Sequence, residues 1–337
     1  MTNILVCPDS YLGSSLDIIT TMILRDLQDI GVNITVIPFV QQRIKLINGS
    51  LDDPEIFARH SLHVLETLLT VMQSDNKILF VDFFQPLLPL LHYYIDCKEI
   101  SVKYGALFHG ATFIPGDFFA EKLWMKPFEI GFVSLMDSIY VPSQYAAQFF
   151  PNVRNNVNVF PYGFCADNYQ KNLDPENKYF DVVIPHRWAS DKGADFYLEV
   201  IIAMPERRFV VSQLGIDSTV PGLGSICRKV KSMKNVIIIG EKSGPSYREA
   251  LVHSRVVIAA NKQELFGYGL REAIASGCIP VCMDWACYPE CIPKDHLFAS
   301  VEEAVELINL YADSYPTTYF SLPNTSFRPI LEDFYGS

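Results

Sequence analysis

Two glutamates, Glu264 and Glu272, have the type and spacing expected of a ligand-binding turn. Glu264 follows an apolar run, 256–260, that is typical of a buried strand. A turn with two glycines comes next, and we expect a helix that starts near Gly269, carries Glu272 in its first turn and ends at Gly277. The dipole and free amides of a helix N-terminus attract anions, and carboxylates accept hydrogen bonds from hydroxyls. Taken singly, each glutamate could also have a purely structural role, Glu272 as a helix-capping acid and Glu264 as an exposed acid in a loop.

The segment PHRWASDKG, residues 185–193, contributes a pair of cations. Arg187 and Lys192 follow a predicted strand and precede a predicted helix. An arginine can fork onto two phosphate oxygens while a lysine supplies a point charge, so the pair suits a diphosphate. From this segment alone, a solvated surface pair explains the two residues equally well.

The first half of the chain offers two further candidates. His109 directly follows the predicted strand 104–108 and precedes Gly110 and an aromatic loop, a place where α/β proteins meet ligands. A single histidine can also be structural. Gly13 lies in the loop 8–15 after the first predicted strand and is a weak phosphate-loop candidate, since a plain strand–helix connection explains it as well.

Four of the eight cysteines lie close together, at Cys278, Cys282, Cys287 and Cys291. Their spacing, C-x3-C-x4-C-x3-C, is not a standard zinc spacing. Two of them fall on a predicted buried strand, where cysteine behaves as a small apolar residue. We therefore expect reduced core thiols and no metal site, with zinc as the alternative.

These candidates belong to a chain in which strands and helices alternate. The expected strands are 3–7, 33–37, 78–81, 104–108, 138–141 and 156–160, then 181–184, 209–212, 236–239, 256–260 and 278–283. The polar, turn-rich segment 161–178 separates the two runs. Two successive runs of this alternation predict an α/β fold with two parallel sheets and right-handed crossovers.

The bulk composition narrows the class of protein. The 337 residues suffice for two domains, and 49% hydrophobic against 19% charged residues indicates a globular chain. The net charge of −11 argues against a generally basic nucleic-acid binder, although it leaves room for a local basic cleft. We see no secretory signal and no clean apolar run of membrane-spanning length. Because we expect reduced thiols, which persist in the cytoplasm, we expect a cytoplasmic protein.

Together the motifs resemble the retaining glycosyltransferases of GT-B fold, in the glycogen-synthase-like and family-four group. The residues that carry this resemblance are Glu264, Phe266, Gly267 and Glu272 (E-x7-E with F-G inside), Ala273, Ala275 and Gly277 (A-x-A-x-G), Arg187 and Lys192 (R-x4-K), Pro161-Tyr162-Gly163, Val141-Pro142-Ser143 and His109-Gly110. In the P-N-G turn of the family, tyrosine here replaces asparagine, and the usual G-G-x-x loop is reduced to Gly13-Ser14-Ser15.

The resemblance implies two Rossmann-like parallel-sheet domains that face each other across a cleft. It places an acceptor-side domain at 1–162, a nucleotide-sugar-binding domain at 163–315 and a C-terminal segment, 316–337, that packs back on the first domain. It implies a UDP- or GDP-linked sugar as co-substrate, hexosyl or pentosyl transfer, no cofactor and no metal. We find no D-x-D triplet of the kind that holds a metal–diphosphate in the other major glycosyltransferase fold.

The resemblance also implies a role for each candidate. Arg187 and Lys192 would neutralise the leaving diphosphate, Glu264 would lie near the donor sugar, and His109 would hydrogen-bond that sugar near the reacting carbon. Glu272 would hold the ribose. The other donor-binding candidates are Gly13, Phe266, Gly267, Tyr268, Gly269 and Leu270.

The acceptor is less constrained. PHRWASDKG, together with Gly277-Cys278, Pro280 and Tyr288-Pro289-Glu290, is similar to the subgroup that contains the tRNA-queuosine mannosyltransferases. The resemblance thus favours a hydroxyl on a modified nucleobase of tRNA or DNA, with a glycan, lipid or protein hydroxyl as the alternative. Candidate acceptor-side residues are Asp82, Asp117 and Lys122.

Two other functions stay open from the sequence. One is a sugar-nucleotide epimerase of the same fold. The other is a non-catalytic protein that binds a nucleotide sugar, against which the presence of Arg187, Lys192, Glu264 and Glu272 argues. A phosphorylase would need a lysine for a pyridoxal cofactor, and no segment resembles such a site. The sequence does not determine the oligomeric state.

Overall fold

The computed structural model describes residues 3–7, 15–38, 54–117, 120, 122–151, 156–169, 175–212, 222–239, 245–314 and 320–336. The chain divides into two compact units: residues 1–163 with 326–337, and residues 164–325. The expected division at 162/163 thus differs by one residue, and the C-terminal segment belongs to the first unit from Ser326 onward instead of from 316.

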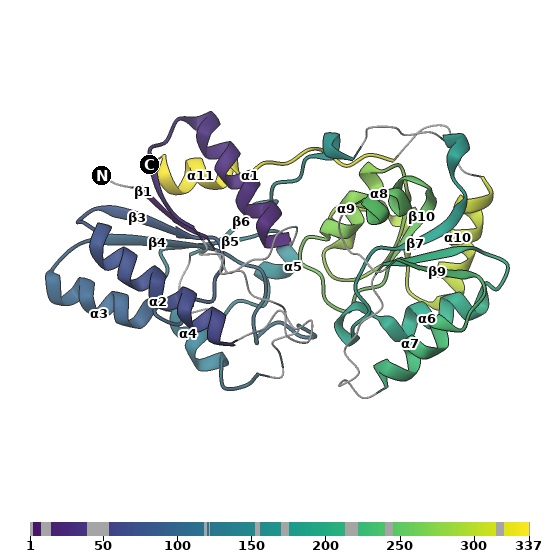
Figure 1. The fold of residues 1–337 in the computed structure, drawn as a ribbon, viewed down its shortest axis with the longest axis horizontal. Coiled ribbons are helices and arrows are strands. Elements are labelled where there is room, and N and C mark those ends of the chain that lie inside the picture. Colours follow the sequence, from purple (N-terminus) through teal and green to yellow (C-terminus); the bar gives the residue numbers. More distant parts are fainter. Residues whose placement is uncertain are drawn as a thin grey trace. The chain divides into compact units, whose positions relative to one another are not determined.

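The described part of the first unit contains a six-stranded parallel sheet in the order β2-β1-β3-β4-β5-β6. Its strands are β1 (Asn3–Val6), β2 (Ile34–Ile37), β3 (Asn76–Phe80), β4 (Val102–Leu107), β5 (Ser138–Val141) and β6 (Val157–Val159). Its helices are α1 (Ser15–Ile30), α2 (Pro54–Val71), α3 (Leu88–Lys98), α4 (Lys126–Leu135), α5 (Gln144–Ala147) and α11 (Arg328–Tyr335). Helices cover both faces of the sheet, which explains why strands such as β1 and β3 are almost entirely buried (Figure 1).

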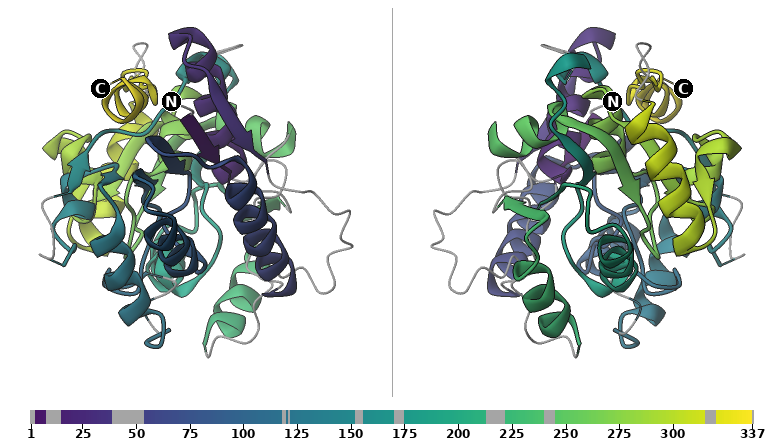
Figure 2. Two further views of the ribbon diagram at one scale, coloured as in Figure 1. Left: turned by 90° about the vertical axis from the view of Figure 1, so that its left-hand side faces the viewer. Right: turned by 90° about the vertical axis from the view of Figure 1, so that its right-hand side faces the viewer.

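The last helix, α11, packs beside α1 on this sheet, although it ends the chain (Figures 1 and 2). Tyr335 donates its hydroxyl hydrogen to the carbonyl of Ile4, at 2.7 Å, and Tyr140 donates to the carboxylate of Asp333, also at 2.7 Å. The ring of Phe334 lies against Gly105 on β4, where a Cβ atom would collide with it. The C-terminal helix is therefore part of the first core.

The described part of the second unit repeats the architecture with the order β12-β11-β10-β7-β8-β9. Its strands are β7 (Phe180–Ile184), β8 (Phe209–Ser212), β9 (Val236–Ile239), β10 (Ser254–Ala259), β11 (Ile279–Met283) and β12 (Leu297–Phe298). Its helices are α6 (Ala194–Ala203), α7 (Leu223–Lys231), α8 (Pro245–Val252), α9 (Tyr268–Ala275) and α10 (Val301–Asp313). The expected strands are confirmed to within two residues at each end.

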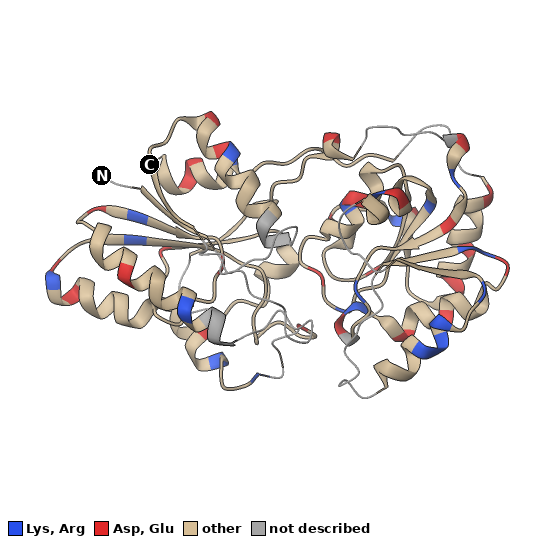
Figure 3. Ribbon diagram, viewed as in Figure 1, with Lys and Arg blue, Asp and Glu red and all other residues tan. Residues whose placement is uncertain are grey.

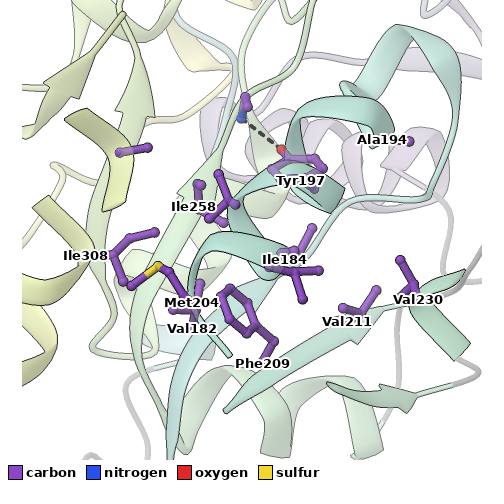
Figure 4. Packing of buried hydrophobic residues seen from close by; sticks show 14 of the residues in the cluster. Val182, Ile184, Ala194, Tyr197, Met204, Phe209, Val211, Val230, Ile258 and Ile308 are labelled. Carbon is purple, nitrogen blue, oxygen red and sulfur yellow. Dashed lines mark hydrogen bonds between the residues drawn. The ribbon is translucent and has the colours of Figure 1, made fainter. Parts of the chain in front are cut away.

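Successive side chains along the strands of the second sheet point to opposite faces and pack into two separate apolar cores. Val182 and Ile184 pack with residues of α6, α7 and α10, as Figure 4 shows for ten labelled members of this cluster. Val183, between them, packs on the opposite face with residues of α8 and α9. Most strand residues are uncharged, and charged residues lie mainly on helices and connections (Figure 3). Across the described residues, no helix is long and apolar enough to span a bilayer.

Candidate functional site

Lys192 and Glu264 come together although their positions in the sequence differ by 72. Lys192 Nζ lies 3.1 Å from Glu264 Oε2 and donates to the carbonyl of Gln263, also at 3.1 Å. Their loops follow β7 and β10, which are hydrogen-bonded parallel neighbours. Because the carboxyl ends of parallel strands meet at one edge of the sheet, this strand order brings Lys192 and Glu264 close together.

Glu264 is fixed in its ionised form by three donors. Besides Lys192, the Nδ2 of Asn261 donates to Oε2 at 2.7 Å, and the amide of Gly267 donates to Oε1 at 3.1 Å. Burial opposes ionisation of this carboxyl, but the positive charge of Lys192 and these hydrogen bonds prevail and lower its pKa to about 2. Glu264 is therefore a carboxylate with a fixed orientation at neutral pH.

Arg187 lies in the same loop as Lys192 and contacts the carboxylate of Asp191, which was not among the sequence candidates. Its Nη2 is 2.9 Å from Asp191 Oδ2, and the same oxygen is 3.8 Å from Lys192 Nζ. Arg187 is more exposed than Lys192, with 39% and 16% of the side chains accessible. The structure thus brings Arg187, Lys192 and Glu264 into one charged cluster in the second unit.

Gly193 makes the turn that places Lys192. It has a left-handed backbone, with φ of 72°, and a Cβ atom there would overlap the carbonyl oxygen of Ala260 at the end of β10. The two loops therefore approach each other at the glycine, and α6 begins one residue later. This close approach accounts for the lysine–glycine pair in PHRWASDKG.

Helix α9 begins one residue earlier than expected, and this corrects the interpretation of Glu272. Gly267 is the N-cap residue with φ of 78°, so Glu272 is the fifth helical residue, and no acid lies in the first turn. Our expectation that Glu272 profits there from the helix dipole is wrong. The expected end of the helix at Gly277 is confirmed. Gly277 adopts φ of 85°, and the backbone amides of Gly277 and Cys278 donate hydrogen bonds to carbonyls of the last helical turn.

Two tyrosines hold Glu272 instead. The hydroxyl of Tyr169 donates to Oε1 at 2.8 Å, and that of Tyr247 donates to Oε2 at 2.7 Å. Burial raises the pKa of this carboxyl, and the two hydroxyl donors oppose the rise. Each carboxylate oxygen retains a lone pair, so Glu272 can still accept bonds from the hydroxyls of a ligand.

The other donor-binding candidates around the start of α9 divide into backbone and side-chain positions. Leu270 is buried in the apolar core beneath the helix, so only its backbone can meet a ligand. The Phe266 ring lies under the guanidinium of Arg271, 4.0 Å from the centroid, and edge-on to Tyr268. Gly269 packs against the ring of His186, where an added Cβ would make ordinary contact.

His186 is a residue of this site that sequence reasoning missed. Asn261 Nδ2 lies 3.4 Å from its Nδ1, and its Nε2 is buried with no hydrogen-bond partner among the described residues. Burial lowers the pKa of the ring to about 4, so the imidazole is neutral at pH 7. The available signal was its place directly after a buried strand and before Arg187.

His109 holds its expected place at the end of β4. Its Nε2 lies 2.8 Å from the carbonyl oxygen of Val81, which can only accept, so Nε2 carries the proton. Burial lowers the pKa of the ring to about 4, which makes Nδ1 a hydrogen-bond acceptor at neutral pH. Tyr162, the tyrosine of the P-Y-G turn, accepts from the amide of Phe108 at 2.7 Å and stacks edge-on against His109.

The acceptor-side candidates belong to the same unit as His109. Burial raises the pKa of Asp82, which directly follows β3 and Val81, to about 6. Gly110 directly follows His109, and the Asp117 carboxylate lies so close to Gly110 that a Cβ atom there would collide with it. Lys122 is half-buried ahead of α4. Gly13 lies outside the described residues.

The four clustered cysteines all lie in the second unit as free cysteines. Cys278, Cys282 and Cys287 are buried and Cys291 is half-buried. Burial raises the pKa of Cys278 to about 11. In the part of the chain that the structure describes, no three His, Cys, Asp or Glu side chains are grouped to hold a metal ion.

Comparison with solved structures shows the fold. A glycosyltransferase from Rickettsia africae superposes with a TM-score of 0.63 at 17% identity, over 94% of this chain and 89% of that one. Sucrose-phosphate synthase from Thermosynechococcus elongatus gives a TM-score of 0.65 at 13% identity, over 92% and 89%. An Escherichia coli trehalose-6-phosphate protein bound with UDP-2-fluoro glucose gives 0.60 at 12% identity, over 93% and 95%. The chain therefore has the GT-B glycosyltransferase fold.

Sequence comparison adds curated relatives, one of which comes from Drosophila melanogaster. The tRNA-queuosine alpha-mannosyltransferase of Drosophila melanogaster is 25% identical over 134 residues. This match spans 37% of the chain and 34% of the mannosyltransferase, about a third of that enzyme's length. No protein-family model matches the chain.

Proposed function

We propose that this chain is a retaining glycosyltransferase that moves a sugar from a UDP- or GDP-linked donor to an acceptor hydroxyl. The observation that carries the proposal is the cluster of Arg187, Lys192 and Glu264 beside the start of α9, within a GT-B fold. Cations at the carboxyl ends of parallel strands, next to a helix N-terminus, suit a diphosphate. One neighbour in fold was solved with UDP-2-fluoro glucose, which supports a nucleotide-sugar donor.

In the proposed reaction, the bond between the anomeric carbon and the diphosphate oxygen breaks as the acceptor oxygen attacks from the same face. The acceptor proton passes to the leaving phosphate oxygen, so charge and atoms balance without a separate base. Arg187 and Lys192 neutralise the negative charge that develops on the diphosphate, and they supply the role that a metal has elsewhere. Neither a metal nor an organic cofactor takes part in this proposal.

The carboxylates and the histidine orient the donor. Glu272 accepts hydrogen bonds from the ribose hydroxyls, and Glu264, held by Asn261 and Gly267, directs its remaining lone pairs at the sugar. His109 offers Nδ1 as an acceptor to a sugar hydroxyl near the reacting carbon, since its Nε2 proton is engaged by Val81. The backbone amides of residues 268–270, at the start of α9, contact phosphate oxygens, while the amide of Gly267 stays bonded to Glu264.

For the acceptor, we propose a hydroxyl on a modified nucleobase of tRNA or DNA. The match with the Drosophila tRNA-queuosine alpha-mannosyltransferase supports this class over glycan, lipid and protein hydroxyls. Asp82, Asp117 and Lys122 are the proposed acceptor-side residues. A net charge of −11 means that only a local basic surface would attract the phosphates of such an acceptor.

A transfer assay tests this function. UDP- and GDP-linked sugars are incubated with the protein and with modified tRNA, modified DNA, or a glycan pool, and products are read by mass spectrometry. The proposal predicts a mass increase of one sugar on a nucleic acid, with α-linkage from an α-linked donor in the NMR spectrum. Transfer to a glycan only would replace the acceptor class, and conversion of the sugar nucleotide without transfer would favour the epimerase.

A further inference from the structure

We infer that Asp191 is a resident anion that occupies the diphosphate position of the donor site and leaves when the donor binds. The inference rests on the proposed function. Asp191 Oδ2 is 2.9 Å from Arg187 Nη2 and 3.8 Å from Lys192 Nζ. A single carboxylate oxygen thus lies between the two cations, as a phosphate oxygen would.

The charges of this cluster cancel. Arg187 and Lys192 contribute two positive charges, and Asp191 and Glu264 contribute two negative charges over contacts of 2.9 to 3.8 Å. A diphosphate gains little from a neutral cluster, because Coulomb attraction to the cations is offset by repulsion from the carboxylates. One carboxylate must therefore yield before the cations can engage a diphosphate fully.

The hydrogen bonds identify Asp191 as the carboxylate that yields. Glu264 is also held by the side chain of Asn261 and the amide of Gly267, so its position survives the loss of Lys192. The Asp191 carboxylate, in contrast, contacts only the two cations among the described residues. A diphosphate replaces both of its contacts at once.

The backbone of Asp191 is well anchored, so the exchange involves the side chain alone. Its carbonyl oxygen accepts from the amides of Lys262 and Gln263, at 3.0 and 3.3 Å, which ties it to the loop that carries Glu264. The carboxylate is 9% exposed, whereas the Arg187 side chain is 39% exposed. The guanidinium can therefore turn from a sheltered internal partner to a ligand from solvent.

The test compares two variants that remove the same charge. Asp191→Asn keeps the size of the side chain and removes its negative charge from beside both cations. Asp195→Asn breaks an ion pair of equal length, 2.9 Å, between Asp195 and Lys262, whose side chains are both exposed and neither of which is a proposed donor-binding residue. Dissociation constants for UDP and GDP are measured by calorimetry at two salt concentrations, and circular dichroism checks that both variants are folded.

We expect Asp191→Asn to bind the preferred nucleotide about fivefold more tightly, the effect of one partly exposed ion pair, with a steeper salt dependence. Asp195→Asn should bind like the wild type. Folded Asp191→Asn that binds equally or more weakly overturns the inference and makes Asp191 a residue that positions Arg187. Should neither nucleotide bind the wild type or either variant, the proposed function itself fails and the inference with it. If Asp191→Asn does not fold, Asp191→Ala is measured in the same way.

Discussion

At the scale of single residues, the candidate donor site depends on carboxylates that the surrounding chain holds in fixed orientations. Glu264 is positioned by donors from its own loop and by Lys192, and Glu272 by two tyrosine hydroxyls. The two glutamates therefore differ in protonation chemistry: the pKa of Glu264 is lowered and that of Glu272 is raised. Each gives a separate prediction.

Replacing Glu272 by alanine should weaken nucleotide-sugar binding at least tenfold, because it removes the acceptor proposed for the ribose hydroxyls. Dissociation constants by calorimetry measure the loss. Glu249→Ala, on the exposed side of α8, is the matched control and should bind as the wild type does. An unchanged affinity in folded Glu272→Ala would refute the assignment.

Glu264 should make stability depend on pH in acid. In the folded protein its pKa is about 2, below its ordinary value near 4.5. The ionised carboxylate therefore stabilises the fold fully above pH 4.5, and this stabilisation is lost as the pH falls toward 2. We expect the gap in unfolding free energy between wild type and Glu264→Gln, on the order of 2 kcal/mol at pH 6, to shrink at pH 3. Urea unfolding at both pH values measures it, with Glu249→Gln as the exposed control. A gap that stays constant would contradict the account.

At the scale of elements, the site is made by loops at the carboxyl edge of the second sheet, and their close approach is set by one glycine. The N-cap of α6 is Gly193, whose missing side chain makes room for the carbonyl of Ala260. Because Lys192 precedes this glycine and Glu264 lies in the loop after β10, the ion pair exists only while β7 and β10 keep this spacing.

Gly193→Ala should destabilise the second unit by about 3 kcal/mol, since it adds a steric overlap to the strain of a positive φ. Gly222→Ala, at the start of α7, is a matched control with φ of 88° and open space around it, and it should cost only about 1 kcal/mol. Chemical denaturation followed by circular dichroism compares them. Equal losses in both variants would show that the approach to Ala260 does not matter.

Sequence patterns predicted these elements well where the signal was local. The apolar runs located the strands, and Gly277 located the end of α9. The start of α9 was misplaced, because two nearby glycines, Gly267 and Gly269, both fit a helix start. The partners of Glu272 were missed for another reason. Tyr169 and Tyr247 lie 103 and 25 residues away in the sequence, and local sequence patterns do not predict contacts over such separations.

Asp191 and His186 show a different limit. Both stand inside the segment that the sequence singled out for its cations, yet their types suggested nothing by themselves. An acid between two cations is commonplace, and only the distances show that its Oδ2 lies between Arg187 and Lys192. The orphan nitrogen of His186 becomes visible only once its burial is known.

At the scale of the whole molecule, each unit has its own core, and the chain returns at its end to the first. Phe334 and Tyr335 of α11 are buried against β4 and β1, so the first core is completed only by the last residues. This return was expected from the resemblance to GT-B enzymes. Local periodicity predicts a helix at the C-terminus but not the sheet on which it packs.

Phe334→Ala should lower the unfolding free energy of the first unit by about 3 kcal/mol, because it empties a packed site on the sheet. Phe128→Ala is the control: that ring is 55% exposed on α4 and its loss should cost less than 1 kcal/mol. Calorimetric unfolding separates the two. Similar midpoints for the two variants would mean that α11 contributes little to this core.

The central claim is that the second unit binds a nucleotide sugar through the Lys192–Glu264 pair, and the thermal unfolding midpoint with added UDP- and GDP-sugars tests it most directly. A ligand that binds only the folded state raises this midpoint with its concentration. We predict such a rise for one nucleotide series in the wild type, and its loss in Lys192→Ala but not in Lys262→Ala, whose side chain is exposed and pairs with the exposed Asp195. No rise with any nucleotide sugar, or an equal rise in Lys192→Ala, would contradict the claim.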